Sequence, residues 1–142
     1  MTDIAFHFNA PSKLTYVCKL LRKAVAAGAR VTVLGDAHVL ARLDGELWTF
    51  STLDFVSHAR APVQGVSAAH TPVVLCETAD QSPHAQVLVN LGHEVPHGFD
   101  RFDRLIEVVS LDDTDRQSAR SRWKQYTDLG HSIIRHDLKL AA

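Results

Sequence analysis

Two arginines and one tryptophan recur at helical spacing in the C-terminal part of the chain, and they could form a binding site for an anion. At about 100° per residue, a helix places Arg116, Arg120 and Trp123 on one narrow face together with Thr127. Guanidinium groups bind carboxylates through paired hydrogen bonds, and an indole ring adds an apolar wall. These residue types suit an acidic peptide, particularly one that ends in a free carboxylate.

A helix is predicted over residues 112–129 to carry this face. Asp112 and Asp113 lie at its start, where negative charge complements the helix dipole. Gly130 follows its last residue, at a position where helices commonly end in glycine. Both signals agree with the spacing of the arginines.

The same helical wheel separates the other side chains of this segment. Ala119 and Tyr126 lie to one side of the arginine stripe and are expected to face the core, whereas Arg122 points away from the stripe. Charged helix faces are commonplace, so spacing alone favours an ordinary solvated face with Trp123 partly tucked into the core. A binding site on this helix needs further support.

Residues 93–97 read H-E-V-P-H and formally match the zinc-binding pattern H-E-x-x-H. That pattern works on a helix, where residues four apart aim two imidazoles at one zinc ion. Pro96 lies inside this segment, and Gly92 and Gly98 flank it. Proline disfavours helix at the preceding residue and donates no helical hydrogen bond. The segment is predicted to be a loop at the end of a strand, and no metal site is expected.

Nucleotide sites and activated nucleophiles lack their usual patterns in this chain. The turn at residues 9–13, after the first predicted strand, has no glycine that would let backbone amides approach a pyrophosphate. The sequence contains no G-x-x-x-x-G-K-[ST] loop and no G-x-S-x-G elbow. Cys18 and Cys76 have apolar neighbours and are interpreted as buried structural residues. No catalytic residue and no cofactor is therefore expected.

The composition predicts one water-soluble globular domain over residues 1–142. Apolar residues make up 46% and charged residues 22% of the chain, a balance that supports a buried core. The net charge of −1 differs from the basic character of dedicated nucleic-acid-binding proteins. No stretch approaches the ~20 apolar residues needed to cross a bilayer, and no secretory signal is visible. The expected location is the cytoplasm.

Strand-like and helix-like segments alternate along the chain. Strands are predicted at residues 4–8, 30–34, 72–76, 85–91 and 104–109. Helices are predicted between Ser12 and Gly28, after Asp36, and over 112–129. The first strand, helix and strand favour two parallel strands joined by a right-handed crossover. The whole order predicts an α/β fold, a three-layer sandwich around a mainly parallel central sheet that is Rossmann-like without a nucleotide-binding loop.

Two ordered motifs resemble the chi subunit of bacterial DNA polymerase III. Residues 108–113 read V-V-S-L-D-D, and residues 116–126 read R-Q-S-A-R-S-R-W-K-Q-Y. Upstream, L-D-G-E-L-W at 43–48 precedes F-V-S-H at 55–58. Members of that family show L-D-x-x-L-W, then F-x-P-H, then a helix patterned K/R-x-x-A-R-x-R-aromatic-K-x-Y. With the opening strand, helix and strand, the resemblance spans nearly the whole chain.

This resemblance implies a non-catalytic replication accessory subunit of the DNA polymerase III holoenzyme. Chi subunits link the clamp loader to single-stranded DNA-binding protein by docking the acidic, hydrophobic C-terminal tail of that protein, so they contact DNA only indirectly. Carried over residue by residue, the tail site comprises Arg116, Arg120 and Trp123, with Val109 as an apolar wall. The arginine stripe then becomes a binding site rather than a solvated face.

The resemblance also implies an apolar interface with the psi subunit, at which Trp48 and Phe55 match. The chain departs from the family pattern at three positions. Ser57 stands in place of the proline of F-x-P-H, Ser110 stands where proline often follows the apolar pair, and Trp123 occupies a position that is more often tyrosine. The first departure concerns the psi interface, and the last keeps an aromatic wall in the tail site.

Two other classes of function remain open from the residues. The basic helix could bind single-stranded DNA directly, with Trp123 as a stacking platform, although such binding needs a longer basic track than this helix offers. A metal-dependent hydrolase could use the histidine-rich loops, although the pattern at 93–97 argues against a shared helix face.

Overall fold

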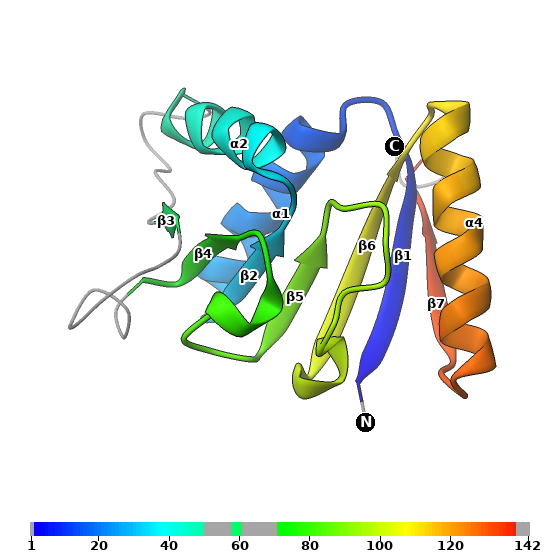
Figure 1. Cartoon of the computed structure of the whole chain (residues 1–142). Coiled ribbons are helices and arrows are strands. Elements are labelled where there is room, and N and C mark those ends of the chain that lie inside the picture. Colours follow the sequence, from blue (N-terminus) through cyan, green and yellow to red (C-terminus); the bar gives the residue numbers. More distant parts are fainter. Residues whose placement is uncertain (1, 50–57, 61–70, 139–142) are drawn as a thin grey trace.

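The computed structural model describes residues 2–49, 58–60 and 71–138 (Figure 1). Along the chain its elements are β1 (Asp3–Ala10), α1 (Lys13–Ala26), β2 (Val31–Leu34), α2 (Ala37–Thr49), β3 (His58–Arg60), β4 (Val73–Cys76), the short 3-10 helix η1 (Ala79–Gln81), β5 (Val87–Asn90), the short 3-10 helix η2 (Phe99–Arg101), β6 (Arg104–Ser110), α4 (Asp113–Asp128) and β7 (Ile133–Asp137). Within these ranges no helix is long and apolar enough to cross a membrane.

The described strands form one seven-stranded sheet in the order β3-β4-β2-β5-β6-β1-β7, and every pairing is parallel. The predicted α/β architecture is therefore confirmed. β1 and β2 are parallel as expected, but β6 and β5 lie between them, so α1 spans more than one strand position. β2, β4 and β5 are buried along their whole length, as expected for strands that are covered on both faces.

The sheet lies between two layers of helices (Figure 1). On one face, Leu21 of α1 and Leu43 of α2 pack in the same apolar cluster as Val33 of β2. On the other face, Tyr126 of α4 packs in a cluster with Leu34 of β2. Successive side chains of a strand point to opposite faces, which is why neighbouring residues of β2 enter different layers. The predicted three-layer sandwich is the observed one.

The helices begin and end close to the signals in the sequence. α2 starts after Asp36, whose Oδ1 accepts the backbone N–H of Val39 at 2.8 Å. α1 ends shortly before Gly28, which has a φ of +84° that favours glycine. Ser12 holds the N-cap position of α1, but its hydroxyl contacts the hydroxyl of Thr15 instead of a backbone N–H. The position of that cap was predicted, whereas the expected capping bond is not present.

β7 was not predicted from the sequence, and it forms one edge of the described sheet beside β1. In the register of this pair, Phe6 lies opposite Arg135. Paired residues in neighbouring strands share a face of the sheet, so Arg135 lies on the face that α4 covers. β7 therefore brings a basic side chain to the helix that carries the arginine stripe.

Candidate functional site

A pocket of about 440 Å³ lies between α4 and the strands β1, β6 and β7. Its lining consists of Phe6, Phe8, Asn9, Val109, Arg116, Ala119, Arg120, Trp123 and Arg135. We call it the arginine pocket. The four residues that the family resemblance assigned to a tail site, Arg116, Arg120, Trp123 and Val109, all line it. The structure brings them together, and their role in binding a tail stays a prediction.

The lining of the arginine pocket is apolar where it meets the sheet. Phe6 and Val109 are buried, and Trp123 is half-buried. The ring centroids of Phe6 and Trp123 lie 4.9 Å apart at an interplanar angle of 57°. Such tilted aromatic pairs contribute to stability beyond their buried area, and they hold the indole in place. Trp123 therefore presents a positioned apolar wall to any ligand of the pocket.

Three exposed guanidinium groups surround this apolar lining. Arg116 and Arg120 lie one turn apart on α4, and Arg135 comes from β7. Among residues 2–49, 58–60 and 71–138, no carboxylate lies within ion-pair distance of any of the three. An apolar pocket with unpaired guanidinium groups at its rim is suited to a ligand that is both apolar and anionic.

The guanidinium of Arg135 lies over two aromatic rings. Its Cζ atom is 5.0 Å from the ring centroid of Phe8 and 5.9 Å from that of Trp123. Stacking of this kind holds the planar group while its N–H edge stays available to an acceptor. Arg135 is a pocket residue that sequence reasoning missed. Its only local signal was the short run Ile133-Ile134 after Gly130, which could have suggested a further strand.

Arg122 has the same charge and lies on the same helix, yet it is fully buried. Its Nε donates to Oε2 of Glu107 at 3.1 Å, and its Nη1 donates to the hydroxyl of Ser118 at 2.6 Å. The hydroxyl of Tyr126 donates to the same Glu107 oxygen at 2.6 Å. Burial, reinforced by the Glu107 carboxylate, raises the pKa of Tyr126 well above its usual value, so the hydroxyl stays a donor. Arg122 was predicted to point away from the arginine stripe, and the structure shows that it lies in the core while Arg116 and Arg120 lie at the surface.

The start of α4 is fixed by two aspartates. Asp112 lies at the helix start, as predicted, and its carboxylate also caps the helix by accepting the backbone N–H of Asp115 at 3.0 Å. Asp115 accepts the backbone N–H of Ser110 at 2.7 Å and pairs with Lys13 of α1 at 3.1 Å. These contacts tie the helix start to both β6 and α1. They set the position from which Arg116 and Arg120 project.

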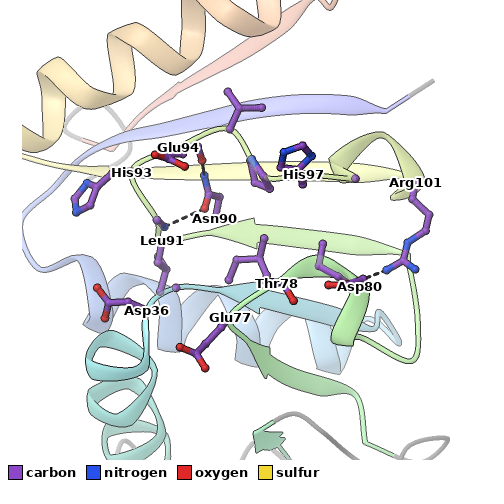
Figure 2. A pocket seen from close by; sticks show the side chains of 17 residues that line it. Asp36, Glu77, Thr78, Asp80, Asn90, Leu91, His93, Glu94, His97 and Arg101 are labelled. Atoms are coloured by element: carbon purple, nitrogen blue, oxygen red, sulfur yellow. Dashed lines mark hydrogen bonds between the residues drawn. The ribbon is translucent and has the colours of Figure 1, made fainter.

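A second cavity of about 900 Å³ opens at the carboxyl ends of β2, β4 and β5 (Figure 2). This edge of a parallel sheet is where many α/β proteins bind ligands. The side chains that line it include the acidic residues Asp36, Glu77, Asp80 and Glu94. Sequence reasoning did not identify this cavity, because its lining comes from three loops that lie far apart in the sequence.

Residues 93–97 lie in a loop at this cavity, as predicted from Pro96. Asn90 shapes the loop, since its Nδ2 donates to the Glu94 carbonyl at 3.1 Å and its Oδ1 accepts the Gly92 N–H at 2.9 Å. In Figure 2 the imidazoles of His93 and His97 do not point toward each other. Within the part of the chain that the structure describes, no three His, Cys, Asp or Glu side chains converge as metal ligands.

Comparison with known proteins decides the family. A family model described as DNA polymerase III chi subunit, HolC, matches residues 1–134. This chain belongs to the chi family. A curated relative, DNA polymerase III subunit chi of Pseudomonas aeruginosa, is 30% identical over 143 residues, which cover 97% of this chain and 98% of the relative. The predicted resemblance is confirmed, and the chain is a replication accessory subunit of the polymerase III holoenzyme.

The second surface expected of a chi subunit lies only partly within the described residues. Trp48, near the end of α2, is 61% exposed, and its ring packs edge-on against His58 with 5.5 Å between centroids. The Nε2 atom of His58 lies 2.7 Å from Oδ1 of Asp44. Phe55 and Ser57 lie outside the described residues. The exposed indole is a feature of the structure, and its role in an interface stays a prediction.

Proposed function

We propose that this chi subunit docks the acidic C-terminal tail of single-stranded DNA-binding protein in the arginine pocket, and that it thereby links this protein to the clamp loader. One observation carries the proposal most directly. Arg116 and Arg120 have no carboxylate partner among the described residues, and they lie beside the apolar wall of Trp123 and Val109 within one pocket. The family membership of the chain supports the same partner.

The chemistry of the pocket matches that of an acidic tail with an apolar end. An apolar side chain of the tail would displace water from the rings of Phe6 and Trp123, where burial is favourable by about 25 cal/mol per Å². Carboxylates of the tail would accept hydrogen bonds from Arg116 and Arg120. These guanidinium groups are exposed, so salt screens their attraction for carboxylates, and this attraction also raises specificity and association rate. The proposal assigns no catalytic, metal or cofactor step to the chain.

We further propose that the surface around Trp48 contacts the psi subunit and through it the clamp loader. A large aromatic side chain with 61% of its surface exposed is typical of interface residues. Phe55, the other residue assigned to this interface, follows α2 closely in the sequence. Trp48 belongs to α2, whereas the arginine pocket is formed by α4 and its neighbouring strands. The two partners would therefore use separate elements of the fold.

Calorimetry with a peptide of the tail tests the docking proposal. Arg120→Glu reverses one charge of the pocket and should abolish binding, while its exposed position leaves the fold intact. Arg42→Glu is the matched control, because Arg42 is also exposed but belongs to α2 and does not line the pocket. If both variants bind the tail peptide with the same affinity as the wild type, the arginine pocket is not the docking site. Tight binding of a single-stranded oligonucleotide by the wild type, in the absence of single-stranded DNA-binding protein, would instead favour direct DNA binding.

A further inference from the structure

Arg135 adds a third positive charge to the arginine pocket from a different element of the fold. Arg116 and Arg120 project from α4, whereas Arg135 lies on the edge strand β7 in register with Phe6. It lies outside the sequence motifs that assign the tail site. Its guanidinium stacks over Phe8 and Trp123, which belong to the lining of the same pocket.

The arginine pocket holds three guanidinium groups that have no carboxylate partner in the part of the chain that the structure describes, and this sets a requirement on the ligand. A single carboxylate can be gripped by Arg116 and Arg120 together, because they lie one turn apart on one helix face. That carboxylate would neutralise one charge and leave the others without a counter-ion. A ligand with a second carboxylate would also satisfy Arg135, whose guanidinium lies over two rings and comes from β7 instead of the helix.

We infer that Arg135 is a third anion-binding residue of the arginine pocket, and that it contacts a different carboxylate of the docked peptide from the one held by Arg116 and Arg120. This inference rests on the proposed function and deepens it. It defines the ligand as a peptide with at least two carboxylates, the terminal one and an acidic side chain, that flank an apolar side chain. A peptide with a terminal carboxylate alone would use only the helix side of the pocket.

Three peptides and three variants separate these contacts in calorimetry. The parent peptide has the acidic tail sequence with a free C-terminus, and the second peptide is amidated at its C-terminus. The third, called the asparagine peptide, has asparagine in place of every acidic side chain. The variants are Arg135→Gln, Arg120→Gln and the control Arg42→Gln. Glutamine keeps much of the side-chain stem over the rings while it removes the charge. As a control for the fold, the midpoint temperature of thermal unfolding should be the same for Arg135→Gln and the wild type if β7 stays paired with β1.

We expect Arg135→Gln to weaken binding of the parent peptide by about tenfold, the size of one charged hydrogen bond. The same loss of affinity is expected with the amidated peptide, because the inference assigns the terminal carboxylate to Arg116 and Arg120 and not to Arg135. With the asparagine peptide, Arg135→Gln and the wild type should bind equally well. Arg42→Gln should match the wild type with every peptide.

Three results would overturn the inference, and they differ in what they say of the proposed function. Wild-type affinity of Arg135→Gln for the parent peptide, with weaker binding by Arg120→Gln, leaves tail docking intact and removes Arg135 from it. A loss that disappears with the amidated peptide shows that Arg135 shares the terminal carboxylate. Absence of any binding by the wild type ends both the inference and the proposed function.

Discussion

Arg122 and Glu107 form an ion pair in the core, with Nε of the arginine 3.1 Å from Oε2 of the carboxylate. At most 1% of either side chain is exposed. The pair joins α4 to β6, and Tyr126 adds a second hydrogen bond from α4 to the same oxygen. It thereby fixes the rotation of the helix about its axis, and this rotation decides which residues of α4 face the arginine pocket.

Loss of this ion pair should destabilise the fold strongly. Arg122→Met leaves the Glu107 carboxylate buried without its charged partner, and breaking a buried pair in this way costs about 3–5 kcal/mol. The double variant Arg122→Met/Glu107→Leu should lose much less, because it leaves no uncompensated charge. Urea denaturation measures both free energies of unfolding. Arg120→Ala is the control on the same helix and should stay within about 0.5 kcal/mol of the wild type.

A small effect of Arg122→Met, similar to that of Arg120→Ala, would contradict the role assigned to the pair. A double variant that is as unstable as the single one would show that Glu107 contributes through packing instead of charge.

Acidification should destabilise the protein through His7. Burial, followed by the neighbouring charges of His136 on β7 and Arg104 on β6, lowers the pKa of His7 from 6.5 to about 4. Tyr16 of α1 also contacts this ring and would donate its hydroxyl to the neutral form. The unfolded chain therefore binds more protons than the folded chain between the two pKa values. His7 does not lower the free energy of unfolding above pH 6.5. Its destabilising effect grows as the pH drops toward about 4.

The measurement is the free energy of unfolding in urea as a function of pH. His7→Asn keeps an acceptor for Tyr16 but removes the titrating group, so its stability should change less between these pH values. An equal slope in both proteins would show that His7 does not cause the effect.

Asp115 should add a second loss of stability at lower pH. Burial raises the pKa of this carboxyl, but the N–H of Ser110 and the ammonium of Lys13 together outweigh burial and hold the pKa below its usual value of 3.8. Its contribution is therefore present above that value and is lost as the pH falls through the folded-state pKa. Asp115→Asn should remove this acid-induced loss and lower stability at neutral pH by about 1–3 kcal/mol. Unchanged stability of Asp115→Asn at neutral pH would contradict the helix-anchoring role.

Neither cysteine should react in the folded protein. Burial, with a smaller effect of Glu46, raises the pKa of the Cys18 thiol to about 11. Burial and Asp80 raise the pKa of the Cys76 thiol to about 11 as well, although Arg101 opposes the shift. Only the thiolate reacts with disulfide reagents, and about 0.1% of each thiol is ionised at pH 8 at such values. Colorimetric titration should detect the two thiols only after denaturation. Rapid labelling of native protein would contradict their burial.

Binding of a tail peptide should weaken as salt is added. The three guanidinium groups of the arginine pocket are exposed, so their attraction for carboxylates is screened once the Debye length falls below about 10 Å. We expect the change to appear mainly as slower association, which stopped-flow measurements of tryptophan fluorescence can follow. An association rate that is independent of salt would show that the arginines do not attract the ligand.

The sequence predicted those parts of the fold and of the site that depend on local periodicity. The apolar runs of β2, β4 and β5 were recognised because fully buried strands read as continuous β-branched segments. The arginine stripe was recognised because the positions of Arg116, Arg120 and Trp123 around one helix follow from their spacing alone. The same geometry showed correctly that Arg122 points elsewhere.

The remaining features depend on contacts between distant residues. No local pattern shows that Glu107 lies where Arg122 points, since they come from different elements. β7 is short and half-exposed, and it joins the sheet only by pairing with β1 at the other end of the chain. Arg135 could therefore not be placed beside Phe8 and Trp123. The cavity at the carboxyl ends of β2, β4 and β5 was missed for the same reason.

The most direct test of tail docking is NMR of the isotopically labelled chain during titration with the tail peptide. The arginine pocket predicts that the indole N–H of Trp123, the Nε–H signals of Arg120 and Arg135, and the amide of Val109 shift together and saturate at one peptide concentration. Shifts confined to the loop at residues 91–98, or no shifts at millimolar peptide, would contradict it.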